Sequence, residues 1–578
     1  MSFVRSAVHL AFGALLVAPT VAAAQAAEPV AGTSVPRALP LKYTGKPTTP
    51  AITPADLMTR LYIYADDSLM GRKVGTEYNL RATAYIEREV RRLGLQPAGE
   101  DGGYFQNIPL FTNYSDTAAS SVKLGSQALA YGTDWFPIPR AGRTIALDGV
   151  PVVYGGATSD TASWIPAAAA TGKVVVLAIP ASSSPFRGVL YSATSRFGKA
   201  AAIFVASLDR MPVAVLQQVE RSSSLRDDPG SVAAPSSILV APRLLDMLFG
   251  AADGLKPGAV GKSLSGKIVL VEERAPGRNV VAILPGSDPA LRGQYVAIGA
   301  HNDHVGFNHD PVDHDSLRAF MSVARPQGAD SPTPKEVTPD QIARIRAITD
   351  SLHRLHGARI DSIYNGADDD GSGTVSVLEI AEAFAKSPVR PKRSLLFVWH
   401  TGEEAGLYGS EYFTDHPSVP RDSIVAQLNM DMVGRGAATD VTGEKKDGGL
   451  THGGPGYLQL VGSRRLSTEL GDLIETVNKR SGLGLAFDYS MDANGHPQNI
   501  YCRSDHYEYA RYGIPIVFFT TGGHSDYHQV TDEPQYIDYG RMAKVATLVH
   551  DAALEVANLD HRVVVDKPKP DPEGRCVQ

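Results

Sequence analysis

The 578-residue sequence contains only two cysteines, Cys502 and Cys576, so a framework of several disulfides cannot hold it together. One disulfide between them is permitted, and the sequence leaves that pairing open. After the N-terminal region, no segment offers about 18 uninterrupted apolar residues, the length that a membrane-spanning helix needs. Stable membrane insertion is therefore not expected.

An excess of basic charge is also missing. Lys and Arg number 55 against 62 Asp and Glu, which gives a net charge of −7, and no basic stripe interleaved with aromatic residues is present. Nucleic acid and anionic membrane are therefore poor candidates as partners. What remains is an ordinary globular composition, 43% hydrophobic and 20% charged, that excludes wholesale disorder, collagen-like sequence and coiled coil.

The first 26 residues have the three-part pattern of a secretory signal peptide. Arg5 precedes a largely apolar run over 7–21, and small residues then supply A-x-A at 24–26. The alternative is an N-terminal membrane anchor, but the apolar run is short and contains Gly13 and Pro19. We expect an exported protein, secreted or periplasmic after cleavage, followed by a Pro-, Ala- and Thr-rich linker over 27–50.

Apolar strands alternate with helical segments along the rest of the chain, which predicts an α/β fold with a central sheet covered by helices on both faces. Strands are expected at 267–272, 279–284, 295–299, 394–399, 423–428 and 514–520, and helices at 81–93, 374–386 and 466–479. Short β-rich runs separated by Gly, Ser and Pro predict an inserted β-rich domain over 133–262. The main domain would then comprise 51–132 and 263–560, and 561–578 would form a flexible tail.

Residues that bind metal ions follow these core strands. His301 and Asp303 come after one strand, Glu403 and Glu404 after another, and Asp431 after a third. In such sheets the carboxyl ends of the strands carry the chemistry. Imidazole and carboxylate ligands without thiolate suit zinc in a hydrolytic site, and two ions can share one bridging carboxylate.

Together these motifs resemble a known enzyme family. The series G-A-H-x-D, D-D-D-G-S-G, E-E-x-G-L-x-G-S, N-x-D-M-V-G and Y-H-x-x-x-D is similar to the M28 family of zinc metallopeptidases, of the co-catalytic aminopeptidase type. The fold that the resemblance implies is a mixed central sheet of the zinc-exopeptidase type. The insert at 133–262 resembles the protease-associated (PA) domain found in many members.

The resemblance also implies a role for each matching residue. Two zinc ions would be bound by five ligands: His301 and Asp431 on one ion, Glu404 and His528 on the other, and Asp369 bridging. Glu403 would be the general base, Asp303 would fix the tautomer of the His301 imidazole, and Tyr527 would stabilise the oxyanion. For Tyr527 the alternative is a packing aromatic beside a ligand.

One departure from the family pattern stands out, because 67 residues separate His301 from Asp369 where the family usually has a short loop. Within this insertion, at about 305–362, Thr338 and Gln341 predict a capping box at the start of a helix that ends near Gly357. Such insertions are often lids or specificity elements. The cluster at 309–315 could bind a further ion, but we favour a solvated loop.

The predicted function is an exported dinuclear zinc aminopeptidase that acts on peptides. Three alternatives stay open: a carboxypeptidase or dipeptidase of the same fold, a glutaminyl cyclase, and a binding protein without catalysis. A carboxypeptidase must recognise a terminal carboxylate, which calls for Arg or Lys, ideally an Arg that binds both oxygens. The segments that flank the ligands supply only the isolated Arg435 and Arg503, which favours the aminopeptidase.

Overall fold

The computed structural model describes residues 39–180, 193–211, 213–226, 235–250, 254–332, 334 and 336–578. The predicted signal peptide and the first part of the linker, 27–38, lie outside these residues. Across the described part of the chain, no helix combines the length and the apolar character needed to cross a membrane.

A nine-stranded mixed sheet forms the core of the main domain. Its strand order is β1-β14-β18-β15-β19-β24-β22-β23. The edge strands are β1 (Gln96–Pro97) and β23 (Ala486–Asp488), and β2 (Phe105–Asn107) also pairs with β14. The four central strands are β18 (Ser394–His400), β15 (Tyr295–His301), β19 (Ile424–Met430) and β24 (Ile516–Thr520), and they run parallel to one another. The flanking strands β14 (Arg278–Leu284) and β22 (Tyr457–Val461) run antiparallel to them. These six strands have near-continuous apolar sequences, as expected for strands that are buried on both faces.

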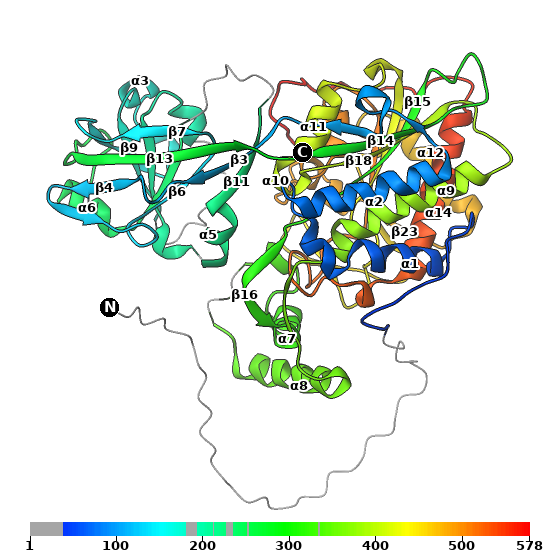
Figure 1. Cartoon of the computed structure of the whole chain (residues 1–578), viewed down its shortest axis with the longest axis horizontal. Helices are drawn as coiled ribbons and strands as arrows, with labels where there is room; N and C mark the ends of the chain where they lie inside the picture. The colour runs from blue at the N-terminus through cyan, green and yellow to red at the C-terminus, as the bar shows by residue number, and fades with distance from the viewer. Residues whose placement is uncertain are drawn as a thin grey trace, which may run out of the picture. The chain divides into compact units, whose positions relative to one another are not determined.

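Helices cover both faces of this sheet, as the sequence predicts (Figure 1). One layer consists of α2 (Glu77–Leu93), α9 (Gly373–Lys386), α14 (Tyr539–Asn558), α12 (Thr468–Ser481) and α1 (Pro54–Tyr64). The opposite face packs against α11 (Tyr408–Asp415) and α13 (His506–Ala510). The three predicted helices are confirmed, although α2 begins four residues earlier than its apolar periodicity suggested.

The β-rich region is wider than the predicted 133–262. One of its two sheets has five strands in the order β6 (Trp135–Ile138), β12 (Ser237–Val240), β10 (Ala202–Ala206), β9 (Val174–Ala178) and β8 (Val152–Ala157). This sheet packs through a shared core with a six-stranded sheet that contains β3 (Leu110–Ser115), β4 (Ser121–Leu124) and β13 (Leu264–Arg274). The prediction that 267–272 belongs to the central sheet is wrong, because β13 pairs with β3, β4 and β7 (Arg143–Ala146) instead. The apolar sequence of a strand predicts that it is buried, but it does not predict which sheet the strand joins.

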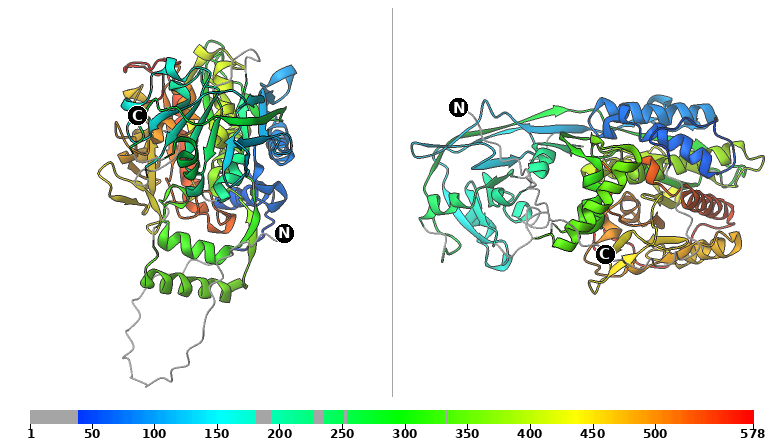
Figure 2. Two further views of the ribbon diagram at one scale, coloured as in Figure 1. Left: turned by 90° about the vertical axis from the view of Figure 1, so that its left-hand side faces the viewer. Right: turned by 90° about the horizontal axis from the view of Figure 1, so that it is seen from below.

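The long insertion forms a ribbon and two helices. Strands β16 (Phe307–Asp313) and β17 (Ile360–Ile363) pair at its base, and α7 (His314–Ala324) and α8 (Pro339–His356) lie side by side (Figure 2). The predicted capping box of Thr338 and Gln341 is present at the start of α8. Between the helices lies the short 3-10 helix η5 (Gly328–Asp330).

The C-terminal residues are held in place, where the sequence suggested a flexible tail. Cys502 and Cys576 form a disulfide. The side chain of Gln578 is buried, accepts a hydrogen bond from the backbone N–H of Tyr501 and donates one to the carbonyl of Met491. These are long-range contacts, so the polar composition of 561–578 could not reveal them.

Candidate metal centre

The predicted ligands gather at one edge of the central sheet. His301 ends β15, Glu403 and Glu404 follow β18, Asp431 follows β19, and His528 lies in the loop after β24. Because these four neighbouring strands are parallel, their carboxyl ends meet at the same edge. Asp369 joins them from the loop η6 (Ala367–Ser372) that leads into α9.

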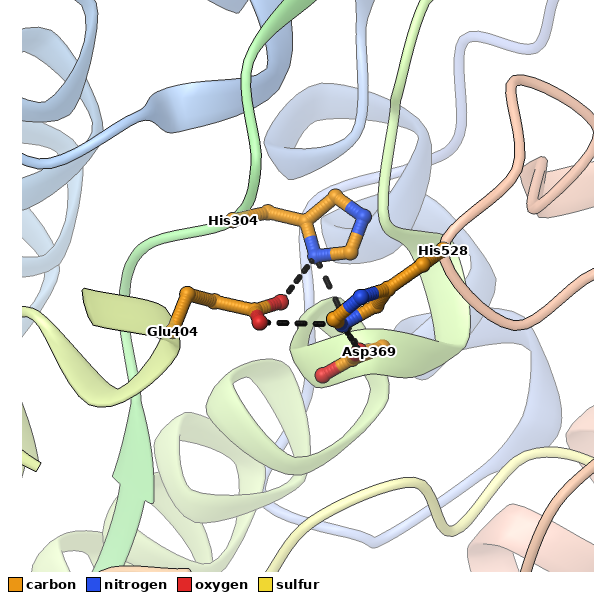
Figure 3. Close-up of side chains that lie close together, drawn as sticks. All are labelled: His304, Asp369, Glu404 and His528. Atoms are coloured by element: carbon orange, nitrogen blue, oxygen red, sulfur yellow. Dashed lines mark ion pairs between the residues drawn. The ribbon is translucent and has the colours of Figure 1, made fainter. Parts of the chain in front are cut away.

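Two groups of ligand atoms share Asp369. In the first group, His301 Nε2 lies 3.1 Å from Asp369 Oδ1 and 3.7 Å from Asp431 Oδ1. In the second group, His528 Nε2 lies 3.0 Å from Asp369 Oδ2 and 2.9 Å from Glu404 Oε2 (Figure 3). One oxygen of the Asp369 carboxylate faces each group, which is the arrangement that a bridging ligand requires.

His304 is a member of the second group that the sequence reasoning did not assign. Its Nδ1 lies 2.7 Å from Glu404 Oε1 and 3.8 Å from Asp369 Oδ2, so Figure 3 shows four side chains converging. The signal was present in the sequence, because His304 follows directly after Asp303 in the run that ends β15. Its direction could not be known, since β15 stops at His301 and the chain beyond it no longer alternates.

The donor atoms of the second group are buried without ordinary hydrogen-bond partners. This holds for His304 Nδ1, Glu404 Oε1 and His528 Nε2, although these atoms lie close together. Buried polar atoms normally find partners, and lone pairs that converge without hydrogen-bond geometry are typical of a cation site. The mixture of imidazole and carboxylate donors fits zinc.

The acidic triplet explains how Asp369 is oriented. Asp370 accepts hydrogen bonds from the backbone N–H groups of His301 and Gly373, and Asp368 accepts one from Gly434. Asp532, in the loop after His528, accepts the N–H groups of Asp368 and Asp369. The outer two carboxylates therefore hold the backbone of the site together, and only the middle one faces the ligand groups.

Glu403 lies beside the first group without belonging to it. Its Oε2 is 4.0 Å from His301 Nε2, and its backbone N–H donates to Asp303 Oδ1 at 3.1 Å. His301 Nδ1 is closer to the backbone carbonyl of Asp303, at 3.2 Å, than to the Asp303 carboxylate, at 3.8 Å. Asp303 thus contacts both residues, with its carbonyl facing the imidazole and its carboxylate fixing the backbone of Glu403.

The pKa shifts reflect a concentration of negative charge. Burial alone lowers the pKa of His528, but the charge of Glu404 and the hydrogen bond to Asp369 raise it well above its usual value. Burial and Asp369 alone would raise the pKa of Glu404, yet His528 and His304 lower it to about 2. Burial, offset in part by His301, raises the pKa of Glu403 well above its usual value. These carboxylates thus attract positive charge strongly, which also favours a divalent cation.

A pocket opens next to the ligand groups. Asp369, Glu403, Asp431 and Tyr527 contribute to its wall, and its apolar lining includes Met432, Met491, Ile500 and Phe518. The Tyr527 ring stacks on His528, with centroids 4.1 Å apart, and its hydroxyl accepts a hydrogen bond from Arg503 Nη2 at 3.4 Å. Tyr527 therefore lies beside a ligand and also reaches the pocket.

The cluster at 309–315, for which we favoured a solvated loop over a further ion site, is not a loop, because it forms the end of β16 and the start of α7. His314 is buried, its Nε2 lies 2.8 Å from Glu533 Oε2, and Asp361 lies close by. The Arg359 guanidinium also binds both oxygens of Glu533, at 2.8 and 3.1 Å. A bound guanidinium already supplies the positive charge there, so these residues form an ion-pair network that joins the insertion to the loop after β24.

Comparison with known proteins agrees with this geometry. Residues 279–553 match Peptidase family M28. Leupeptin-inactivating enzyme 1 of Streptomyces exfoliatus is 28% identical over 31% of this chain and 35% of its own length. Leucine aminopeptidase 1 of Penicillium rubens is 29% identical over 37% of this chain and 55% of its own length. The matches thus span about a third to a half of these relatives.

Among solved structures, the chain is similar to the aminopeptidase from Aneurinibacillus sp. strain AM-1, with 16% identity, a TM-score of 0.49, and coverage of 89% of this chain and 97% of that chain. The match to the family extends from β14 to α14 and contains every strand end that supplies a candidate ligand. Over this segment, residues 279–553, the chain is similar to peptidase family M28.

Proposed function

We propose that this protein is an exported zinc aminopeptidase that removes the N-terminal residue of peptides. It would hold two ions, one by His301, Asp369 and Asp431 and the other by Asp369, Glu404 and His528, with His304 as a further ligand of the second ion. Zinc bound there would supply Lewis-acid chemistry, activating water and polarising the scissile carbonyl.

One observation favours attack at the amino end: both arginines near the site are already paired with carboxylates of the protein. Arg435 is buried, and its Nη1 lies 2.9 Å from Asp526 Oδ2. Arg503 Nη1 lies 2.8 Å from Asp330 Oδ2. A carboxypeptidase needs such a cation free to bind the terminal carboxylate of its substrate. The pocket instead presents Glu403, a carboxylate that belongs to neither ligand group and suits a terminal ammonium group.

The remaining residues have roles that their contacts support. The Glu403 carboxylate accepts a proton from the attacking water and passes it to the departing amine. Asp303 keeps Glu403 in place through the backbone hydrogen bond at 3.1 Å. Tyr527 donates its hydroxyl hydrogen to the oxyanion, and the hydrogen bond that it accepts from Arg503 orients the phenol.

Names of the relatives support the substrate class. The Penicillium rubens relative is named a leucine aminopeptidase, and an apolar pocket lined by Met432, Met491, Ile500 and Phe518 fits an apolar N-terminal side chain. The β-rich region would be a PA domain that limits access or holds substrate. Export rests on the signal-peptide pattern of the first 26 residues.

The test compares three forms of one leucine-initiated peptide: free at both ends, acetylated at the amino end, and amidated at the carboxyl end. We expect acetylation to remove most of the turnover and amidation to leave it nearly unchanged, with zinc content measured on the same preparation. The reverse pattern would establish a carboxypeptidase. Loss of ammonia from a matched glutamine-initiated peptide, with its N-terminal residue cyclised and no peptide bond cleaved, would establish a cyclase.

A further inference from the structure

The long insertion reaches the pocket through its short element η5. Gln327 and Asp330, at the two ends of the segment around η5, both line the pocket that contains Glu403 and Asp431. No other described part of the insertion lines this pocket. The insertion thus adds two polar side chains, one of them charged, to a wall whose other residues come from the main domain.

Backbone contacts attach η5 firmly to the loop that carries His528. The Ala329 N–H donates to the Tyr527 carbonyl at 3.0 Å. Gly328 has φ +60°, and a Cβ atom there would lie 2.5 Å from the same carbonyl oxygen, so only glycine permits this approach. The Arg325 guanidinium closes the segment by donating to the carbonyls of Ala329 and Ser331.

Two side-chain pairs then connect the insertion to the main domain across the pocket wall. Asp330 Oδ2 accepts a hydrogen bond from Arg503 Nη1 at 2.8 Å, and Gln327 Oε1 accepts one from Gln498 Nε2 at 3.2 Å. Arg503 in turn donates from its other terminal nitrogen to the Tyr527 hydroxyl. The side chains of Arg503 and Asp330 are 33% and 39% exposed, so both remain within reach of a molecule in the pocket.

This arrangement decides which charges a ligand meets. An unpaired guanidinium at this position would offer a two-pronged donor for a carboxylate, either the side chain of an acidic residue or the carboxyl end of a dipeptide. In this structure Asp330 binds one terminal nitrogen of the Arg503 guanidinium, and the Tyr527 hydroxyl binds the other. The pocket wall is therefore electrically balanced, and an incoming carboxylate would lie beside Asp330 and be repelled by it.

We propose that Asp330, which belongs to the insertion, determines substrate specificity. Its ion pair with Arg503 keeps that guanidinium from binding a substrate carboxylate, so substrates with a carboxylate near the scissile bond are excluded. The substrate class is then peptides with an uncharged, apolar N-terminal residue, and acidic N-terminal residues and dipeptides are disfavoured. This inference rests on the proposed aminopeptidase function, which it narrows to one substrate class.

The experiment compares the activity of the full-length protein on a substrate with an acidic N-terminal residue and on one with an apolar N-terminal residue. Values of kcat/KM are determined for leucyl and glutamyl p-nitroanilide in the wild type and in the Asp330→Asn variant. We expect the glutamyl-to-leucyl ratio to rise about tenfold or more in Asp330→Asn, because a charge-assisted hydrogen bond from Arg503 becomes available to the substrate. The double variant Asp330→Asn, Arg503→Met should lose this gain.

The matched control is Asp350→Asn. Asp350 lies on α8 of the same insertion, is exposed and does not line the pocket, so this variant has the same change in net charge without unmasking Arg503. Its ratio should equal that of the wild type. A loosened fold would lower both activities, whereas an unmasked arginine raises the glutamyl activity selectively.

Calorimetric titration of the zinc-loaded variants with free leucine and free glutamate gives a second readout that does not depend on turnover. If the wild type cleaves neither p-nitroanilide, the proposed function fails, and the titration still decides the inference. If Asp330→Asn leaves the preference for glutamate over leucine unchanged, the proposed role of Asp330 is wrong. It is also wrong if Asp350→Asn or the double variant increases that preference as much as Asp330→Asn does.

Discussion

Two adjacent glutamates, Glu403 and Glu404, are predicted to respond in opposite ways to the same substitution. Glu403 lies 4.0 Å from His301 Nε2 and belongs to neither ligand group, whereas Glu404 lies 2.9 Å from His528 Nε2 and belongs to the second. Changing Glu to Gln preserves size and removes the negative charge. We therefore expect Glu403→Gln to abolish proton transfer while keeping the metal, and Glu404→Gln to lose metal.

The size of the Glu403→Gln effect follows from its neighbours. General-base catalysis contributes about 10²- to 10⁴-fold, or about 3 to 5 kcal/mol of activation free energy. The nearby carboxylates cannot take over, because Asp303 Oδ1 binds the Glu403 N–H and Asp431 Oδ2 accepts a hydrogen bond from Ser504. We expect the upper part of that range. The backbone hydrogen bond at residue 403 does not involve the side chain, so the local structure should persist.

The assay combines metal content, determined by elemental analysis after dialysis, with hydrolysis of a leucine-initiated peptide. The expected stoichiometry is two zinc ions in the wild type and in Glu403→Gln, and about one in Glu404→Gln. The further variant Asp369→Asn should retain the least zinc, because Asp369 contributes an oxygen to each group. Near-full activity of Glu403→Gln, or a metal loss equal to that of Glu404→Gln, would refute the assignment of roles.

Three further predictions concern a missed ligand, the C-terminal residues and a buried acid. His304→Asn should weaken zinc binding at one site only, by about tenfold or more in competition with a chelator, since His304 Nδ1 faces only the second group; equal weakening of both ions would contradict this. Cys576→Ser opens a 74-residue loop and should lower the free energy of unfolding by about 2–4 kcal/mol, measured against wild type in denaturant, whereas the two proteins should agree under reducing conditions. Burial raises the pKa of Glu379 to about 7 despite its ion pair with Arg60, so folding favours the protonated carboxyl. The stabilisation of the folded state by this group is therefore fully present below the unfolded pKa and is lost as the pH rises through 7. The stability of the wild type relative to Glu379→Gln should thus fall by about 1–3 kcal/mol between pH 5 and pH 8, and a constant difference would contradict the shift.

The sequence by itself determined most of the elements that build the centre. Apolar runs longer than three or four residues predicted the strands that lead to His301 and Asp431, because strands buried on both faces need continuous hydrophobic sequence. Local capping chemistry predicted the start of α8, since the pairing of Thr338 with Gln341 depends only on residues three apart. Such features depend only on residues that are close in the sequence, so the sequence is sufficient to predict them.

Only the tertiary structure decided which residues meet. The imidazole of His304, the membership of β13 in the second sheet and the burial of Gln578 all depend on partners far away in the sequence. The same is true of Asp330, whose partner Arg503 is 173 residues away along the chain. An isolated carboxylate in an insertion has no local signal for its function. Its role arises because folding places it 2.8 Å from a guanidinium in the pocket wall, and that distance is set by the packing of the whole domain.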